Sequence, residues 1–489
     1  MRLGELLRAA GLAGDSDQTV TGFAIDHRKV APGTIFGAFQ GATVNGEDFI
    51  PAAVGAGAIA VVARPEARVE GALHLADVNP RRAFARLAAG FFSPYPSAIV
   101  AVTGTNGKTS CVEMTRQIWR MAGERAASIG TLGVTTPDGS VSTGLTTPDI
   151  VTFLANMAGL AREGVTHVAY EASSHGLDQY RNEGLTVAAS AFTNFSRDHL
   201  DYHGTMEAYF AAKMRLFTEV VAPGSPAVIH DAGDGSEWTA KAIATAEARG
   251  LDVRTVGEGG AFLKLIAREP GQLGQLLHIE HEGTVRKVNL PLIGAYQAAN
   301  ALVSAGLAMA TGVSASATFD ALTRLQPVRG RLERAALNQA GAPAYVDYAH
   351  TPDALEAAIA ALRPHVAEGG KLIVVFGAGG DRDAGKRPQM GEVAARAADI
   401  AIVTDDNPRS EDPASIRAAI MAGAGSNTRE IEGRRAAIAA AIGEAGARDI
   451  VLIAGKGHEQ GQIFGSGENM RIEAFDDVEV ARECAGGQC

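Results

Sequence analysis

An apolar run that ends in a glycine-rich turn constrains the fold of this chain most. Residues Ala98-Ile-Val-Ala-Val-Thr103 have the composition of a buried strand, and Gly104-Thr-Asn-Gly-Lys-Thr109 follows without a break. Beyond the turn, Cys111, Met114 and Ile118 recur at the spacing of one helix face. Strand, glycine loop and helix in this order are the parts of a phosphate-binding cradle in an α/β sheet.

The same loop predicts how a nucleoside triphosphate would be held. Glycines let backbone N–H groups close around phosphate oxygens, and the helix N-terminus adds a partial positive charge. We expect Lys108 to meet the β- and γ-phosphates and the Thr109 hydroxyl to bind Mg²⁺. The usual spacing has a glycine where this chain has Val102, so the loop is a shortened variant. The predicted ATP-binding residues of the loop are Gly104, Thr105, Asn106, Gly107, Lys108, Thr109 and Ser110.

A glycine turn ahead of a buried helix is the simpler interpretation of this segment. If only Gly-Lys-Thr were present, without the strand before it and the helix after it, that simpler interpretation would be hard to reject. The complete strand, loop and helix favour ATP binding instead.

Most of the chain alternates strand-like apolar runs with alanine-rich helical stretches, which is typical of α/β proteins. Its 489 residues exceed what one hydrophobic core usually serves, and we expect three domains. The first, 1–96, ends in a proline-rich linker. The central domain, 97–333, carries a P-loop ATPase-like parallel sheet, within which 226–290 resemble strands and turns. The third, 334–489, is predicted to be Rossmann-like without the dinucleotide glycine fingerprint.

Four candidate strands lie in the third domain, each ending in polar or glycine residues. They are 344–349, 372–376, 400–404 and 450–454. An open parallel sheet places its binding loops at such strand ends, so we expect a binding site there.

Composition excludes several classes of protein. The net charge of -11 argues against a nucleic-acid binder, which would present a basic surface. No apolar run approaches the ~18 residues that span a bilayer, and Glu5 and Arg8 interrupt the N-terminal apolar stretch. The three cysteines lack metal-ligand spacing. We therefore expect a cytoplasmic enzyme without membrane insertion.

Further motifs follow the glycine loop in a fixed order. They are Thr146-Thr-Pro-Asp149, Glu171-Ala-Ser-Ser-His175, Phe192-Thr-Asn-Phe-Ser-Arg-Asp-His-Leu-Asp-Tyr-His-Gly204, Ala211-Ala-Lys213, Gln326-Pro-Val-Arg-Gly-Arg331, Asp347-Tyr-Ala-His-Thr-Pro352, Gly379-Gly-Asp-Arg-Asp383, Asp406-Asn-Pro-Arg409 and Gly455-Lys-Gly-His-Glu459. With the loop, this set resembles the Mur ligase family along almost the whole chain. The resemblance implies an ATP-dependent ligase of peptidoglycan synthesis that joins a carboxylate to an amine through an acyl phosphate.

Asp406-Asn-Pro-Arg409 is similar to the form found in family members that add meso-diaminopimelate. The implied substrates are ATP, that amine and the acceptor UDP-MurNAc-L-Ala-D-Glu, and a monomer is expected. A lysine-adding ligase, a folylpolyglutamate synthase and a nucleotide-binding protein without catalysis are the alternatives. The last would leave Glu171, Lys213 and the acids of the third domain without a role.

The resemblance also assigns the reaction centre. It implies catalytic roles for Lys108, Glu171, His199 and Lys213, and a Mg²⁺ site formed by Thr109, Glu171, His199 and Lys213 as its carbamate. Taken singly, a residue such as Glu171 is more often a solvated acid at a strand end. A residue such as His199 is more often a hydrogen-bonded loop residue, and one such as Lys213 a surface lysine. Further ATP contacts are implied for Asn300, Arg331, Asp347 and His350. In place of the family's Asn-x-x-Asn, this chain has Gln297-Ala-Ala-Asn300. Gln297 keeps the amide group but carries it on a longer side chain.

Two substrate sites complete the assignment. The UDP-muropeptide is expected to meet the first domain and His27, Thr146, Thr147, Ser173, Gln179 and Arg181. His27 stands where the family usually has serine. Diaminopimelate is expected to meet Arg382, Asp406, Asn407, Pro408, Arg409, Gly455 and Glu459. Arg409 can bind a carboxylate through two parallel hydrogen bonds, and lysine lacks the distal carboxylate that would pair with it.

Overall fold

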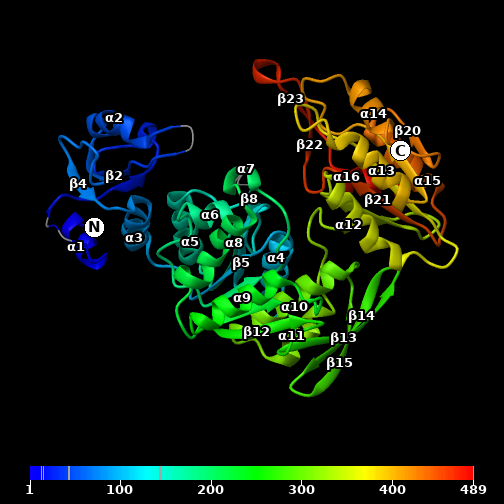
Figure 1. Ribbon diagram of the computed structural model, residues 1–489, viewed down its shortest axis with the longest axis horizontal. Coiled ribbons are helices and arrows are strands. Elements are labelled where there is room, and N and C mark those ends of the chain that lie inside the picture. The colour runs from blue at the N-terminus through cyan, green and yellow to red at the C-terminus, as the bar shows by residue number, and fades with distance from the viewer. Residues whose placement is uncertain (13, 15, 42–43, 142–145, 488–489) are drawn as a thin grey trace. The chain divides into compact units, whose positions relative to one another are not determined.

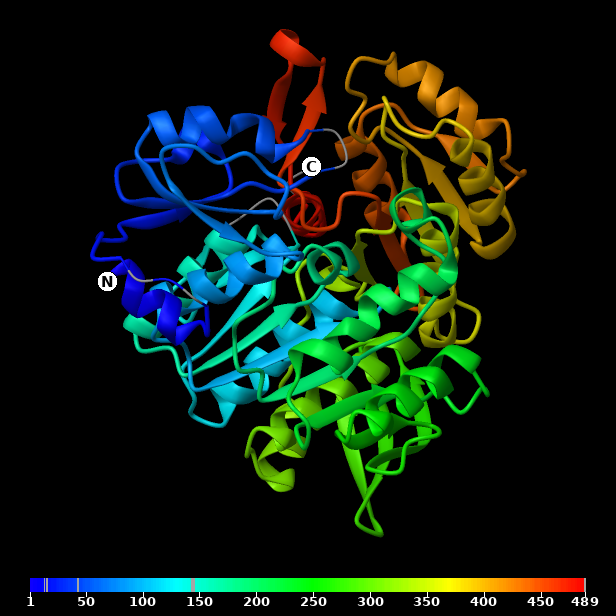
Figure 2. The same ribbon diagram turned by 60° about the vertical axis from the view of Figure 1, so that its left-hand side comes forward.

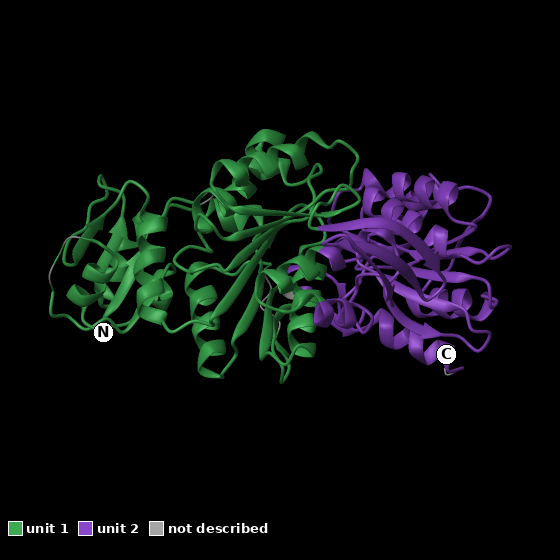
Figure 3. Ribbon diagram, turned by 90° about the horizontal axis from the view of Figure 1, so that it is seen from below, with its two compact units in different colours: residues 1–262, 303–315 green, residues 263–302, 316–489 purple. Residues whose placement is uncertain are grey.

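Parallel strands alternate with helices through most of the chain, as the sequence predicted (Figure 1). The computed structural model describes residues 1–489 except 13, 15, 42–43, 142–145 and 488–489. Two units separate by their internal contacts: unit 1 comprises 1–262 and 303–315, and unit 2 comprises 263–302 and 316–489 (Figure 3). The expected boundaries at 96/97 and 333/334 stay a prediction.

Unit 1 begins with a four-stranded parallel sheet in the order β1-β2-β3-β4. Strand β3 consists of small and β-branched residues that are almost entirely buried. The Asn79 side chain accepts a hydrogen bond from the Arg82 amide and so caps the last helix of this part, which has Pro80 in its first turn. The elements are α1 (Leu3–Ala9), β1 (Gly22–Ala24), η1 (His27–Lys29), β2 (Thr34–Gly37), η2 (Gly46–Phe49), α2 (Ile50–Gly55), β3 (Ala58–Ala63), β4 (Leu73–Ala76) and α3 (Pro80–Phe92).

The larger sheet of unit 1 has β5 near its centre, in the order β12-β11-β10-β5-β9-β6-β7-β8. The strands from β12 to β6 are parallel, β7 pairs antiparallel with β6, and β8 pairs antiparallel with β7. Their bounds are β5 (Ala98–Thr103), β6 (Ala126–Gly130), β7 (Gly133–Thr135), β8 (Ser140–Val141), β9 (His167–Glu171), β10 (Ala189–Phe192), β11 (Pro226–His230) and β12 (Asp252–Gly257). The parallel strands nearest β5 are buried on both faces, which explains their continuous apolar runs.

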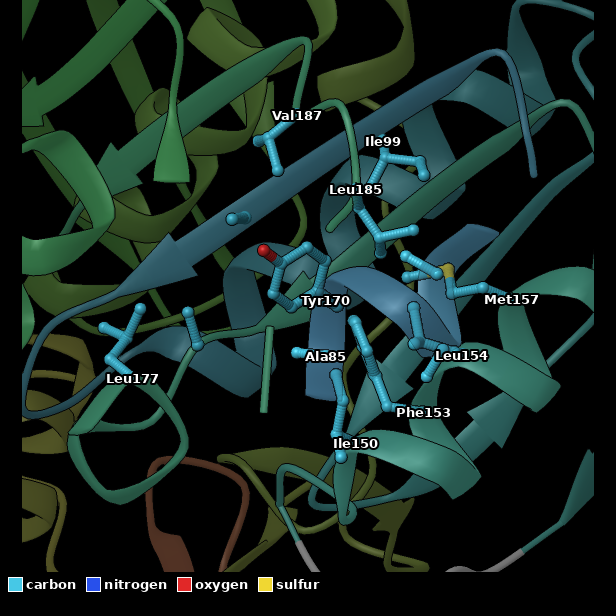
Figure 4. Packing of buried hydrophobic residues seen from close by; sticks show 14 of the residues in the cluster. Ala85, Ile99, Ile150, Phe153, Leu154, Met157, Tyr170, Leu177, Leu185 and Val187 are labelled. Carbon is cyan, nitrogen blue, oxygen red and sulfur yellow. The ribbon is translucent and has the colours of Figure 1, made fainter. Parts of the chain in front are cut away.

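Helical segments alternate with these strands along the chain. They are α4 (Lys108–Met121), α5 (Ile150–Arg162), α6 (Ser174–Asp178), α7 (Leu200–His203), α8 (Met206–Arg215), η3 (Leu216–Val220) and α9 (Glu237–Ala248). On α5, Phe153, Leu154 and Met157 gather around Tyr170 of β9, and the rings of Phe153 and Tyr170 meet edge to face at 5.1 Å (Figure 4).

Helix α9 corrects the expectation of strands and turns throughout 226–290. Ser236 caps it by accepting a hydrogen bond from the Thr239 amide, and alanine-rich sequence continues it. Its fully buried positions are Ala242 and Ala246, which lie four residues apart. Because alanine is so small, this helix face presents a weak apolar signal in the sequence.

Unit 2 contains the antiparallel strands β13 (Leu263–Gly271), β14 (Gly274–His281) and β15 (Thr284–Leu290), and the helices α10 (Ala295–Ala310), continuing into unit 1, and α11 (Ala315–Leu322). A six-stranded sheet follows in the order β16-β17-β21-β18-β19-β20, parallel except for the edge strand β16. Its strands are β16 (Glu333–Leu337), β17 (Pro343–Asp347), β18 (Leu372–Phe376), β19 (Ile400–Val403), β20 (Thr428–Glu430) and β21 (Ile450–Ala454).

Alternate residues of β18 explain the doubly wound architecture of unit 2. Leu372, Val374 and Phe376 pack against α12, α13 and α14, whereas Ile373 and Val375 pack against α15 and α16. The bounds are α12 (Pro352–Leu362), η4 (Arg363–His365), α13 (Lys386–Ala397), α14 (Pro413–Met421), α15 (Arg434–Glu444) and α16 (Asp477–Ala485). The four strands predicted here are confirmed, although β17 ends two residues before 349 and β19 one before 404.

A short antiparallel hairpin, β22 (Gly461–Phe464) and β23 (Arg471–Ala474) with η5 (Gly467–Asn469) at its turn, completes unit 2. Figures 1 and 2 show it in red, extending beyond the six-stranded sheet of that unit. No helix among the described residues is long and apolar enough to cross a membrane.

Candidate functional site

The glycine loop turns sharply between β5 and α4. Gly104 has φ 137° and Gly107 has φ 87°, a backbone region that favours glycine. A Cβ on Gly104 would also lie 2.0 Å from the Thr193 hydroxyl oxygen. The loop therefore requires glycine at 104 for two independent reasons, backbone conformation and space. Val102, at the position of the missing glycine, is a buried residue of β5 paired with Glu171 of β9.

Lys108 closes this loop on itself. Its ammonium donates hydrogen bonds to the carbonyl oxygens of Gly104, at 3.1 Å, and Thr105, at 2.7 Å. The Asn106 amide donates to the Asn194 side chain, which ties the loop to the end of β10. Thr109 and Ser110 are buried in the first turn of α4. The predicted loop residues are thus brought together around one helix N-terminus.

Glu171 ends β9, the strand beside β5. It is 2% exposed, and its carboxylate accepts hydrogen bonds from the Thr131 amide at 2.7 Å and the Thr131 hydroxyl at 3.3 Å. A Cβ on Gly130 would lie 2.1 Å from the same carboxylate, so the glycine provides its space. The two hydrogen bonds from Thr131 fix the position of this side chain at the end of β9, beside the strand that leads into the glycine loop.

Lys213 is a buried lysine of α8, not the surface residue that its position on a helix would suggest. It is 1% exposed, and its Nζ donates to the Gly104 carbonyl oxygen at 2.6 Å. Nζ also lies 4.4 Å from the centre of the Tyr209 ring. Burial, and then the nearby charge of Lys108, hold the pKa of Lys213 well below its usual value, while Asp198 acts in the opposite direction.

His199 approaches this group from the turn before α7. Its backbone has φ 51°, and its exposed ring lies 5.9 Å from the Tyr209 ring and 4.9 Å from the His175 ring. The Tyr209 hydroxyl is 3.3 Å from that of Thr105 in the loop. Tyr209, which the sequence motifs did not single out, therefore connects His199, Lys213 and the phosphate loop.

Among the described residues, no three histidine, cysteine, aspartate or glutamate side chains lie together as metal ligands would. The predicted Mg²⁺ ligands are of mixed type, with one hydroxyl, one carboxylate, one imidazole and one lysine. The buried Glu171 carboxylate and the Thr109 hydroxyl supply the oxygen atoms that Mg²⁺ prefers. These residues fit a Mg²⁺ site in chemistry.

The predicted acceptor residues beyond β9 form one hydrogen-bonded network. The Thr147 hydroxyl lies 2.9 Å from both the Glu171 carbonyl oxygen and the Ser173 hydroxyl. Arg181 donates to the Thr147 carbonyl oxygen at 2.9 Å and to the Gln179 side chain at 2.7 Å. Thr146 is joined through a 3.0 Å contact with the Thr131 hydroxyl. Hydroxyl, amide and guanidinium groups suit the carboxylates and amides of a peptide.

Two residues lie on the helical elements beside the first sheet of unit 1. His27 lies on η1 with its ring stacked on Phe49 at 4.5 Å, a contact that a serine could not make. Arg81, on α3, was not predicted. Burial lowers the pKa of Arg81, the charge of Arg181 acts in the same direction, and Tyr202 and Asp178 act against them. Its guanidinium donates to the Gln40 carbonyl oxygen at 2.9 Å and lies 4.9 Å from the centre of the Phe39 ring.

The remaining predicted ATP residues lie in unit 2. Gln297 donates to the Arg331 carbonyl oxygen at 2.7 Å and accepts from Asn300 at 3.4 Å, so its longer arm orients both neighbours. The Asp347 carboxylate accepts from the Leu332 and Ala349 amides. Burial raises the pKa of Asp347, and the charge of Arg331 opposes that shift. His350 is exposed, with its ring 4.6 Å from the Tyr348 ring.

The predicted amine site gathers where β18, β19 and β21 end. The segment 406–409 runs beside β22: the Arg409 amide donates to the Ile463 carbonyl oxygen at 3.0 Å, and the Gly465 amide donates to the Arg409 carbonyl oxygen at 2.7 Å. Arg409 has φ 52°, and its guanidinium donates to the Gly380 carbonyl oxygen at 2.8 Å.

All seven predicted amine-site residues meet here. A Cβ on Gly379 would lie 2.8 Å from the Arg409 guanidinium and 3.9 Å from Cγ of the exposed Arg382. Pro408 is buried beside Gly380, and a Cβ on Gly455 would lie 2.5 Å from the Asp406 carboxylate. Asn407 donates to the Glu459 carboxylate at 2.8 Å. Cationic and anionic groups therefore stand side by side, as a substrate with ammonium and carboxylate groups requires.

Comparison with known families and proteins matches nearly the whole chain. The Mur ligase middle domain matches residues 102–308, the glutamate ligase domain of Mur ligases matches 330–457, and the catalytic domain of the Mur ligase family matches 19–92.

Individual relatives agree with these domains. The UDP-N-acetylmuramoyl-L-alanyl-D-glutamate–2,6-diaminopimelate ligase of Zymomonas mobilis is 58% identical over 99% of this chain and 98% of its own length. The same ligase of Bradyrhizobium diazoefficiens is 53% identical over 94% of each chain. A solved structure of this type of ligase superposes with a TM-score of 0.77 at 32% identity, covering 100% of this chain and 99% of that one. MurF of Thermotoga maritima in complex with ADP, at 19% identity, TM-score 0.60 and coverages of 91% and 96%, shares the fold.

Proposed function

This chain belongs to the Mur ligase family, and from that premise we propose that it adds meso-2,6-diaminopimelate to the D-glutamate carboxylate of UDP-MurNAc-L-Ala-D-Glu. It is an ATP-dependent, peptide-bond-forming ligase of peptidoglycan precursor synthesis. The agreement of the Zymomonas mobilis ligase with 99% of the chain at 58% identity is the main support. The amine site around Arg409 supports the choice of amine.

The chemistry follows from the weakness of a carboxylate as an electrophile. ATP transfers its γ-phosphoryl group to the carboxylate, and the acyl phosphate that forms is attacked by the amine with release of phosphate. Lys108 and the loop amides are proposed to stabilise the negative charge that develops on the phosphoryl oxygens. Mg²⁺, when bound by Thr109, Glu171, His199 and Lys213, would neutralise phosphate charge at the same place.

A carbamate on Lys213 is part of this proposal. A carbamate forms when a neutral amine attacks CO₂ and releases a proton, so an amine with a lowered pKa is prepared for it. Lys213 is buried and donates to a loop carbonyl. Conversion would place an anion beside the predicted Mg²⁺ site, close to the charge of Lys108, which opposes a positive charge on Lys213.

The lysine-adding reaction is the second candidate, and Arg409 argues against it. The guanidinium is directed toward the turn at 379–380, next to Arg382. Diaminopimelate brings a distal carboxylate to such a group, whereas lysine would leave it unpaired. We also propose a monomer that acts in the cytoplasm, where ATP is available.

Release of phosphate is the direct test of the reaction. The full chain is incubated with ATP and Mg²⁺, and phosphate is measured with acceptor and amine each present or absent. We expect release only when UDP-MurNAc-L-Ala-D-Glu and meso-diaminopimelate are both present, with L-lysine a poor substitute. Phosphate release that needs neither acceptor nor amine would indicate a simple ATPase. Faster phosphate release with L-lysine than with meso-diaminopimelate would indicate the lysine-adding ligase.

A further inference from the structure

Lys456 is a fully buried lysine that the proposed reaction leaves without a role. It lies two residues after β21 and is 0% exposed. Its ammonium donates to the Gly461 carbonyl oxygen at 2.6 Å, the Asn407 side-chain oxygen at 2.9 Å and a Glu459 carboxylate oxygen at 3.3 Å. A lysine ammonium has three N–H donors, so these three acceptors account for all of them.

These contacts determine how the Asn407 amide is turned. Its oxygen accepts from Lys456 and from the Ile463 amide, at 2.9 and 3.0 Å. Its nitrogen must then face Glu459, to which it donates at 2.8 Å. If the amide were reversed, its N–H groups would face the Lys456 ammonium and the Ile463 amide, which are both donors. Such a contact is unfavourable for buried groups. Lys456 therefore helps set which groups of Asn407 and Glu459 remain for a ligand.

Glu459 differs from Lys456 in exposure. Its side chain is 33% exposed, whereas that of Lys456 is 0% exposed. One Glu459 oxygen accepts from both Asn407 and Lys456, so the carboxylate is anchored from within unit 2 while part of it reaches solvent. A buried ammonium costs free energy unless it is paired, and the Lys456–Glu459 pair offsets that cost.

We propose that Lys456 is a positioning residue for the amine substrate: it holds Asn407 and Glu459 in the orientation in which they receive the diamino acid. This inference rests on the proposed function, because that function assigns Asn407 and Glu459 to diaminopimelate. Lys456 is fully buried and acts through these two side chains. Its loss should weaken amine binding more than ATP binding or acceptor binding.

A double-mutant cycle on the full chain tests this role. The variants are Lys456→Met, Glu459→Gln and the double variant, with Lys371→Met as a matched control that removes an exposed lysine just before β18. For each, kcat and KM are measured for meso-diaminopimelate, ATP and UDP-MurNAc-L-Ala-D-Glu, and the melting temperature is recorded. If Lys456→Met does not fold, Lys456→Gln, which keeps an N–H donor without the charge, replaces it in the cycle.

We expect Lys456→Met to raise KM for meso-diaminopimelate by roughly 10- to 100-fold, the usual size of a lost charged hydrogen bond. KM for ATP and for the acceptor should stay close to wild type, and Lys371→Met should leave all three unchanged. The double variant should be little worse than the poorer single variant, because both changes break one network.

Three results would overturn the inference alone: an unchanged KM for the amine, equal rises for all three substrates, or additive effects in the cycle. Wild-type enzyme that ligates no meso-diaminopimelate would instead overturn the proposed function and this inference with it. The wild-type reaction is therefore measured first, which keeps the two failures distinguishable.

Discussion

Arg409 has an uncommon backbone conformation within the predicted amine site. Its φ of 52° lies in the left-handed region, which is uncommon for residues other than glycine. Hydrogen bonds from its own amide to Ile463 and from Gly465 to its carbonyl oxygen hold that conformation. The backbone thereby directs the guanidinium toward Gly380. Such a conformation persists only where its surroundings determine it, and such sites are often functional.

Replacing Arg409 by alanine should therefore remove the choice between amines. Diaminopimelate should lose about 2–5 kcal/mol in kcat/KM, because a partly buried partner of its distal carboxylate is gone. Lysine should lose little, since it never had that carboxylate. Comparing kcat/KM of both amines with wild type and Arg409→Ala measures the effect.

The matched control is Arg396→Ala, which removes an exposed arginine of α13 paired with Glu356. It should leave both amines unaffected. An equal fractional loss of both amines in Arg409→Ala would mean that Arg409 supports the fold and does not select the amine.

Lys213 offers a second residue-scale prediction. Lys213→Ala should lose most activity and recover part of it when a short carboxylic acid is added, because the acid can replace the anion of the carbamate. Rates with and without added acetate give the measurement. Lys241→Ala, which removes an exposed lysine paired with Glu237, is the control and should not respond to acetate. An unmodified ammonium on Lys213 in a well-resolved structure of the active enzyme with Mg²⁺ would contradict the proposal.

At the scale of elements, the turn between β5 and α4 is the proposed phosphate-binding position. Strand β5 lies between β9 and β10, so the residues that follow these strands meet the loop. Glu171 ends β9, and Thr193 follows β10. The loop is thus a product of three neighbouring strand ends, as is usual for parallel α/β sheets.

Gly104→Ala should distort this turn. The added methyl group would lie 2.0 Å from the Thr193 hydroxyl oxygen, and φ 137° is unfavourable for alanine. We expect weaker ATP binding and a destabilisation of roughly 1–3 kcal/mol, measured by titration with a fluorescent ATP analogue and by denaturant unfolding.

Gly123→Ala separates the effect of backbone conformation from that of a close contact. Gly123 also has a positive φ, 96°, but no atom lies within 4 Å of its Cβ position. This control should destabilise the chain without changing ATP binding. Normal ATP affinity in Gly104→Ala would show that the loop tolerates a shifted Thr193 and that the close approach is unimportant.

At the scale of the whole molecule, the two units should respond separately to core changes. In unit 2, Arg434 and Asp477 form a fully buried ion pair at 2.7 Å, and Arg434 also donates to the carbonyl oxygens of Ala454 and Asp405. These contacts join α15 and α16 to the ends of β21 and β19. A buried charge without its partner is strongly unfavourable.

Arg434→Met should destabilise unit 2 by about 3–5 kcal/mol, since it leaves Asp477 buried and unpaired. Arg434→Met/Asp477→Leu should recover part of that loss. Hydrogen exchange followed by mass spectrometry should show lost protection in β17 and β21 but unchanged protection in β5. Equal loss of protection in β5 would mean that the two units unfold as one.

Local patterns determined much of what the sequence predicted. The α/β class, the strands of unit 2 and the phosphate loop depend on spacing within short segments, and the structure has them within one or two residues of the expected bounds. Helix α9 was not predicted from the sequence, because its fully buried positions are two alanines. The family followed from motifs along the whole chain, and the comparisons confirm it.

Contacts between distant residues were decided only by the tertiary structure. The burial of Lys213 against Gly104, the link through Tyr209 and the contact of Lys456 with Asn407 all join segments far apart in sequence. A lysine on a helix has the same local pattern whether it is solvated or buried. Which of these states it takes depends on the elements that the fold packs around it, because burial and hydrogen-bond partners are properties of space and not of sequence spacing.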